Sequence, residues 1–171
     1  MTLTQLNALT SDQAQAEFMR CCGSSRWASR MTERRPFGSS DELAITARRI
    51  WQGLSHEDWK EAFSHHPKIG DVASLREKFA TTAGWAGREQ AGVKDANESV
   101  LHQLAEGNLR YESKFGYIFI VCATGKSAGE MLAMLKARLD NDPSDEILIA
   151  AGEQEKITEL RLKKLLMEEK G

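Results

Sequence analysis

The stretch SSDELAITARRIWQGL, residues 39–54, decides the fold class. Ser39 is followed three positions later by Glu42, a spacing typical of the capping box that begins a helix. Apolar residues then recur at intervals of three and four, which places them on one face of a helix. They are Leu43, Ala47, Ile50, Trp51 and Leu54. The stretch therefore predicts an amphipathic helix whose apolar face packs against a core.

Similar signals recur on both sides of this helix. The capping pairs are Thr10 with Gln13, Ser55 with Asp58, and Ser127 with Glu130, and residues 142–145 end one helix and begin the last. A long helical pattern starts at Arg88 and stops at Gly116. Periodicity does not assign the apolar run 117–123, which we interpret as a helix that continues after a break. We expect an all-α fold, a compact single-domain bundle of about six to nine helices over residues 1–171.

Composition and charge narrow the class of protein. The chain has 171 residues, 41% of them hydrophobic and 28% charged, which is typical of a soluble globular protein with one core. Its 23 Lys and Arg nearly balance 25 Asp and Glu, so nothing indicates a nucleic-acid partner. The first 15 residues lack the pattern of a secretory signal, and no apolar stretch is long enough to span a membrane. We expect a cytoplasmic protein without a membrane partner.

The cysteines are an odd set of three, namely Cys21, Cys22 and Cys122. Neighbours in sequence such as Cys21 and Cys22 rarely form a useful crosslink, so reduced thiols are expected. Cys122 lies in an apolar run without a charged neighbour that would lower its pKa. We interpret it as a core residue and not as a nucleophile.

The first candidate site is the segment 65–71, which reads HHPKIGD. Pro67 disfavours a helical conformation at His66, which places His66 on a loop or at a helix end. An imidazole with an unperturbed pKa of about 6.5 can take and return a proton near neutral pH. The alternative is a surface loop with two solvated histidines. A metal site is disfavoured, because no ligand spacing accompanies the pair.

The second candidate site is the segment 84–92, which reads GWAGREQAG. Its glycines indicate a loop that enters a helix, with Glu89 in the first turn. Free backbone N–H groups at such a position suit an anionic or amide-bearing ligand, and Gln90 offers both a donor and an acceptor. The alternative is that Glu89 only complements the helix dipole at the surface.

A third candidate is Arg161, which shares a helix face with Ile157 and Leu165 at intervals of four residues. An arginine on an apolar face needs a partner. That partner is either a protein carboxylate in a buried ion pair or the carboxylate of a substrate.

The segment 123–127, ATGKS, resembles the end of a phosphate-binding loop. The first glycine of that motif would fall at position 120, which is Ile120. We therefore assign Ser127 to helix capping and do not expect nucleotide binding.

Four segments together resemble one family, the 2-oxo-4-hydroxy-4-carboxy-5-ureidoimidazoline (OHCU) decarboxylases of ureide metabolism. They are residues 66–71, 88–92, 119–128 and 160–162, and the match covers nearly the whole chain. The resemblance implies an all-α homodimer that needs no cofactor or metal and makes (S)-allantoin in urate breakdown. It also implies catalytic roles for His66 and Glu89, and a substrate anion held by Arg161.

The resemblance further implies a set of substrate-binding residues around these three. They are Pro67, Ala86, Gly87, Arg88 and Gln90, with the backbone of Phe119, Ile120, Val121, Cys122 and Ala123. Ala86 departs from the family, where many members look to have a serine, and we expect Trp85 or a backbone group to replace that contact. Two other functions are considered. A His/Glu hydrolase of a cyclic ureide would use the same residues, whereas a non-enzymatic helical interaction module would use none of them for chemistry.

Overall fold

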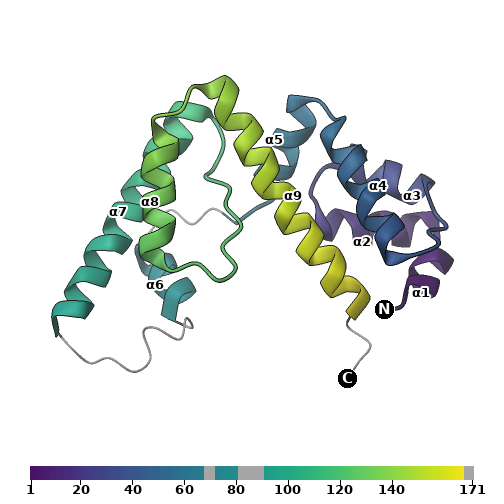
Figure 1. The fold of residues 1–171 in the computed structure, drawn as a ribbon, viewed down its shortest axis with the longest axis horizontal. Helices are drawn as coiled ribbons and strands as arrows, with labels where there is room; N and C mark the ends of the chain where they lie inside the picture. The colour runs from purple at the N-terminus through teal and green to yellow at the C-terminus, as the bar shows by residue number, and fades with distance from the viewer. Residues whose placement is uncertain (68–71, 81–90, 168–171) are drawn as a thin grey trace. The chain divides into compact units, whose positions relative to one another are not determined.

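The computed structural model describes residues 1–67, 72–80 and 91–167 (Figure 1). These ranges hold nine α-helices and no β-strand, so the all-α prediction with six to nine helices is confirmed. The helices are α1 (Leu3–Ala8), α2 (Ser11–Cys21), α3 (Ser25–Glu33), α4 (Ser40–Gln52), α5 (His56–Ser64), α6 (Val72–Ala80), α7 (Ala91–Phe115), α8 (Ala128–Leu139) and α9 (Pro143–Met167). None of the described helices combines the length and apolar composition that a membrane span requires.

Side-chain caps begin the helices where the sequence predicted them. Full capping boxes precede α2 and α5, at Thr10 with Gln13 and at Ser55 with Asp58. Helix α4 differs in one detail: Ser39 Oγ accepts from the Glu42 amide at 3.1 Å, but the Glu42 carboxylate accepts from Gly38 at 2.6 Å. The Glu42 side chain therefore accepts from the backbone amide of Gly38, and not from that of Ser39 as in a full capping box. Ser127 caps α8 by accepting from the Glu130 amide, as expected.

The chain forms two compact units, which we describe separately. Unit 1 contains residues 1–66 and 151–171, and unit 2 contains residues 67–150. Helix α9 therefore contributes its first turns to unit 2 and its remainder to unit 1.

Unit 1 is built around the predicted face of α4. Leu43, Ala47, Trp51 and Leu54 are all buried, as are Trp27 and Trp59. Each of these three tryptophans also donates its indole N–H to a backbone carbonyl, to Ala47, Ala151 or Trp51, at 2.9 to 3.1 Å. Burying the ring while satisfying its one polar group is what makes tryptophan suitable for a core. Of the predicted stripe only Ile50 is partly exposed.

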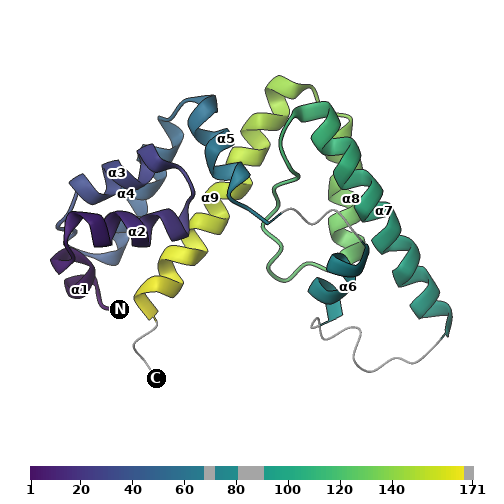
Figure 2. The ribbon, with the colours of Figure 1, turned by 180° about the vertical axis from the view of Figure 1, so that it is seen from behind.

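Unit 2 contains helices α6, α7 and α8 and the first turns of α9. Helices α7 and α8 lie side by side (Figure 2). Gly107 lies at this contact: a Cβ atom there would come within 2.6 Å of Leu135 Cδ2. The glycine in the middle of α7 thus permits a close approach between two helices, and α7 continues through it.

The prediction of a helix over 117–123 is wrong. Gly116, with φ of +84°, ends α7, and the residues from 117 to 123 form neither a helix nor a strand. The rings of Tyr117 and Phe119 pack edge-on against Tyr111, with centroids 5.9 and 5.3 Å away. The Ile120 carbonyl accepts from a side chain instead of from a helical amide. Tertiary contacts therefore replace the helix that the apolar run allowed.

Candidate active site

His66 lies just after the end of α5, as the sequence predicted. The backbone amides of His65 and His66 donate to the carbonyls of Ala62 and Phe63 at 3.2 and 3.3 Å, and these bonds extend the last helical turn. Pro67 follows directly and stops the helix. The His66 side chain is half-buried, whereas His65 is exposed. The two neighbouring histidines thus occupy different environments.

The segment before α3 holds the histidine loop closely. A Cβ atom on Gly23 would come within 2.5 Å of both Cβ and Cγ of His65. Real side chains do not reach that separation, so only glycine fits here without a shift of the loop. Gly23 therefore helps to fix the loop that carries His66.

A fully buried amide holds the His66 ring. His66 Nε2 lies 2.5 Å from Gln154 Oε1, and Gln154 has no solvent exposure. Gln154 Nε2 donates in turn to Thr158 Oγ1 at 3.0 Å, one turn further along α9. The sequence analysis missed both residues. The available signal was the spacing of four residues from Gln154 to Thr158 and again from Thr158 to Leu162, which places an amide and a hydroxyl on an apolar helix face.

Arg161 lies two turns beyond Gln154 on α9, in the same unit as His66. Its Nη1 donates to the Cys21 carbonyl at 3.4 Å, and the residue is exposed. Within the described residues it forms no ion pair with a carboxylate. The buried ion pair that the sequence allowed is therefore not found in this part of the chain.

Two thiols that the charge of Arg161 influences, those of Cys21 and Cys22, are protonated at neutral pH. Burial raises the pKa of Cys21 to about 12 and that of Cys22 to about 11, and in both cases the opposing effect of Arg161 is smaller. All three cysteines are free and buried, as expected. A buried thiol without its thiolate form is a poor nucleophile, so Cys21 and Cys22 serve packing.

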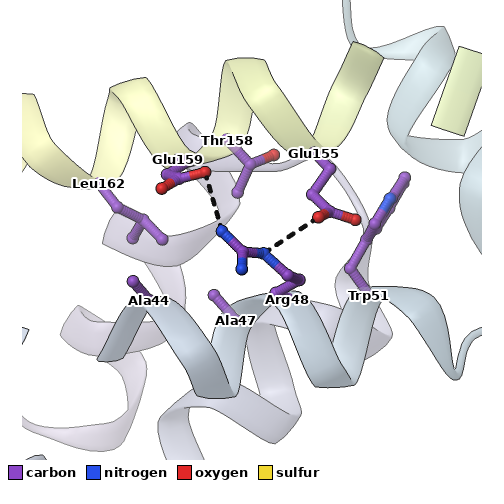
Figure 3. A pocket seen from close by; sticks show the side chains of 8 residues that line it. All are labelled: Ala44, Ala47, Arg48, Trp51, Glu155, Thr158, Glu159 and Leu162. Carbon is purple, nitrogen blue, oxygen red and sulfur yellow. Dashed lines mark hydrogen bonds and ion pairs between the residues drawn. The ribbon is translucent and has the colours of Figure 1, made fainter. Parts of the chain in front are cut away.

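A small pocket in unit 1 lies between α4 and α9 (Figure 3). Its lining residues are Ala44, Ala47, Arg48, Trp51, Glu155, Thr158, Glu159 and Leu162. Arg48 reaches across it, with Nε 3.2 Å from Glu155 and Nη2 3.4 Å from Glu159. Protein carboxylates already neutralise the guanidinium, and no predicted site residue lines the pocket. We therefore do not assign it to the substrate.

The predicted backbone contact at 119–123 lies in unit 2, where side-chain cations hold two of its carbonyls. Arg138 Nη1 donates to the Ile120 carbonyl at 2.7 Å, and Lys126 Nζ donates to the Cys122 carbonyl at 2.8 Å. The guanidinium of Arg138 also lies 4.5 Å from the ring centroid of Phe119. This stretch is therefore fixed by residues of α8 and of the loop before it.

Arg138 belongs to a buried polar cluster that the sequence analysis did not identify. Its Nε donates to Glu146 Oε1 at 2.6 Å, and Asn141 Nδ2 donates to Glu146 Oε2 at 2.9 Å. Tyr111 donates its hydroxyl to Glu146 as well. Burial, followed by this hydrogen bond, raises the pKa of Tyr111 above its ordinary value. Every polar group of Glu146 is thus compensated, as a fully buried carboxylate requires.

The remaining predicted site residues, Ala86, Gly87, Arg88, Glu89 and Gln90, lie outside the described residues. Pro67 is described and exposed. Unit 1 thus holds His66 and Arg161, and unit 2 holds Pro67 and residues 119–123. That these residues and Glu89 line one pocket stays a prediction.

A family model for OHCU decarboxylase matches residues 7–163. The chain belongs to the OHCU decarboxylase family. The predicted family, and with it the prediction of an enzyme of the carboxy-lyase class, is therefore confirmed. Among the OHCU decarboxylases, the protein of Haloferax volcanii is 28% identical over 95% of this chain and 94% of its own length. That of Xenopus laevis is 33% identical over 79% of this chain and 77% of its own.

A longer relative carries the same region within a larger protein. The uric acid degradation bifunctional protein TTL of Arabidopsis thaliana is 44% identical over 87% of this chain, which spans only 46% of that protein.

Two solved structures resemble this one, each with a TM-score of 0.70. An OHCU decarboxylase crystallised in the presence of (S)-allantoin is 44% identical, and the match covers 88% of this chain and 96% of that one. An (S)-allantoin synthase is 18% identical, over 96% of this chain and 53% of that one, and shows the shared fold alone.

Proposed function

We propose that this member of the OHCU decarboxylase family decarboxylates OHCU to (S)-allantoin, with His66 as the general acid and base. The observation that carries the proposal is the hydrogen bond between the half-buried His66 ring and the fully buried Gln154 amide. A solvated surface histidine would have no such partner. A ring held in one orientation is what proton delivery to one face of an intermediate demands.

The chemistry of the substrate explains why so few groups suffice. The carboxylate that leaves lies β to a ring imine, so the electron pair of the broken C–C bond flows onto nitrogen as carbon dioxide departs. A proton then adds to one face of the intermediate. Because the substrate carries its own electron sink, we expect no cofactor and no metal. The protein has to orient the substrate, stabilise the developing anion and supply the proton.

We assign the binding of the substrate carboxylate to Arg161. Its guanidinium has no carboxylate partner among the described residues, and its hydrogen bond there goes to a backbone carbonyl at 3.4 Å. A planar guanidinium can grip a carboxylate through two parallel hydrogen bonds. Glu89 beside the histidine, and Pro67, Ala86, Gly87, Arg88 and Gln90 as substrate contacts, belong to the same proposal.

The backbone of 119–123 also belongs to it, with one restriction. The carbonyls of Ile120, Cys122 and Ala123 already accept hydrogen bonds, from Arg138 and from the side chain and amide of Lys126. We therefore expect a substrate contact to come from the other backbone groups of this stretch. A homodimer and a cytoplasmic location are proposals of the same kind.

The test is the product formed from freshly oxidised urate. The protein should accelerate the release of carbon dioxide and give allantoin with the circular dichroism of a single enantiomer. A hydrolase acting with His66 and Glu89 would consume the substrate without releasing carbon dioxide. An interaction module would leave both signals at the rate and racemic composition of the buffer control, and either result would overturn the proposal.

A further inference from the structure

We infer that Gln154 is a positioning residue, which determines through its carbonyl oxygen which nitrogen of His66 exchanges the proton. The inference rests on the proposed role of His66 in catalysis. It starts from the chain of contacts from His66 through Gln154 to Thr158, all within unit 1.

Hydrogen bonds at both ends orient the side-chain amide of Gln154. Gln154 Nε2 donates to Thr158 Oγ1 at 3.0 Å, and the two side chains are 0% and 6% exposed. In this contact the amide nitrogen of Gln154 faces the hydroxyl oxygen. The carbonyl end of the amide must then point at His66.

The tautomer of the imidazole follows from that orientation. A carbonyl oxygen only accepts hydrogen bonds, so His66 Nε2 must carry a proton to donate to it. The neutral ring therefore has its lone pair on Nδ1, and we assign proton transfer to that nitrogen. The same Nε2–H bond persists when Nδ1 is protonated, so the ring keeps one orientation through the whole cycle.

The choice of an amide at position 154 has a chemical reason. A carboxylate would orient the ring equally well, but its charge would favour the imidazolium and weaken His66 as an acid. A neutral acceptor fixes the ring without that bias. The Gln154 amide can be completely buried because each of its ends has a hydrogen-bond partner: His66 at the oxygen and Thr158 at the nitrogen.

Two substitutions at this position separate orientation from packing. Gln154→Met keeps an unbranched side chain of similar volume and removes the acceptor. Gln154→Glu keeps the acceptor and adds a charge. The matched control is Gln52→Met, because Gln52 is an exposed glutamine of the same unit, and its side chain bonds to Glu155 among the residues that the structure describes.

The first measurement does not depend on activity. The His66 Cε1–H resonance, identified by its loss in His66→Ala, is titrated by NMR in each folded variant. In Gln154→Glu its midpoint should rise by about one pH unit or more, as expected for a new carboxylate in contact with an imidazole. Gln52→Met should leave the midpoint where it is. A midpoint in Gln154→Glu within 0.3 of wild type would show that residue 154 does not contact His66 and would overturn the inference.

The second measurement is steady-state kinetics together with the chirality of the product. Gln154→Met should lower kcat by about 10- to 100-fold, leave KM within about threefold, and give allantoin of reduced enantiomeric purity. The acid limb of the kcat profile in Gln154→Glu should move to higher pH with the NMR midpoint. Wild-type kcat and a single enantiomer in Gln154→Met would overturn the positioning role. If His66→Ala itself kept full turnover, the proposed function of His66 would fail, whatever the NMR titration of the Gln154 variants showed.

Discussion

Arg138 and Ile120 are joined by a hydrogen bond of 2.7 Å that runs from a buried guanidinium to a backbone carbonyl. The same guanidinium is paired with Glu146, which is completely buried. Arg138 thus contacts both the buried carboxylate of Glu146 and the backbone of residues 119–123. Because helix α8 carries this arginine, the 119–123 stretch is fixed although it has no regular secondary structure of its own.

Removing Arg138 should destabilise unit 2 strongly. Arg138→Met leaves Glu146 buried without a cation, which typically costs about 3–5 kcal/mol. The control is Arg76→Met, because the Arg76–Glu98 pair is exposed to solvent and such pairs contribute little to stability. Urea unfolding of both variants measures the difference. Equal losses of stability would contradict the importance of the buried cluster.

Substitution of the two histidines should separate catalysis from packing. His66→Ala should reduce kcat by about 10²- to 10⁴-fold, the usual contribution of a general acid or base, while the protein stays folded. His65→Ala should have far less effect, because its exposed side chain packs on Gly23 and has no assigned chemistry. Carbon dioxide release and the dichroism of the allantoin are measured for both. Full turnover in His66→Ala would make Glu89 the next candidate for the proton donor.

Arg161→Lys should be poorly tolerated, although it keeps the charge. An ammonium group cannot reproduce two parallel hydrogen bonds to a carboxylate, so KM should rise more than kcat falls. The folded state should change little, because the residue is exposed and its hydrogen bond within the described part of the chain is a long one, at 3.4 Å. Initial rates over a range of substrate concentrations give both constants. A loss confined to kcat would point away from ground-state binding of the substrate.

Stability should fall at alkaline pH because of Cys21 and Cys22. Both thiols ionise near pH 9.0 in the unfolded chain, but burial raises their pKa to about 12 and about 11 in the folded one. The unfolded state therefore holds fewer protons above pH 9, and the free energy of unfolding decreases by about 1.4 kcal/mol per pH unit for each thiol. Below pH 9 both states hold the thiol protons and the effect vanishes.

The measurement is urea unfolding at pH 8.5 and at pH 10.5, for wild type and for the variant with Cys21→Ala and Cys22→Ala. The raised pKa of Tyr111 acts in the same direction above pH 10, but it is common to both proteins. The variant should lose less stability between the two pH values. An identical loss would show that the thiols are not shielded in the native protein.

The sequence predicts those structural features that residues close together in the chain determine, such as the beginnings of helices. Capping pairs such as Thr10 with Gln13 act within one turn of helix, so their spacing alone announces them. Ile120 shows the opposite case: its run of apolar residues suits a helix equally well, but its carbonyl accepts a hydrogen bond from Arg138, 18 residues later, and the run is not helical. Gln154 was missed for a related reason, because its partner His66 lies 88 residues away. Family resemblance supplied the roles of His66 and Arg161, which periodicity alone left open.

The distribution of aromatic residues gives the two units separate optical signals. Trp27, Trp51 and Trp59 lie in unit 1, while the two tyrosines of the chain, Tyr111 and Tyr117, lie in unit 2. Trp85→Phe would leave every indole in unit 1. In that variant, emission excited at 295 nm would follow one unit, and phenol absorbance the other. A single-domain chain, as the sequence predicts, should give superimposable denaturation curves from the two chromophores, and separated midpoints would reveal two cooperative blocks.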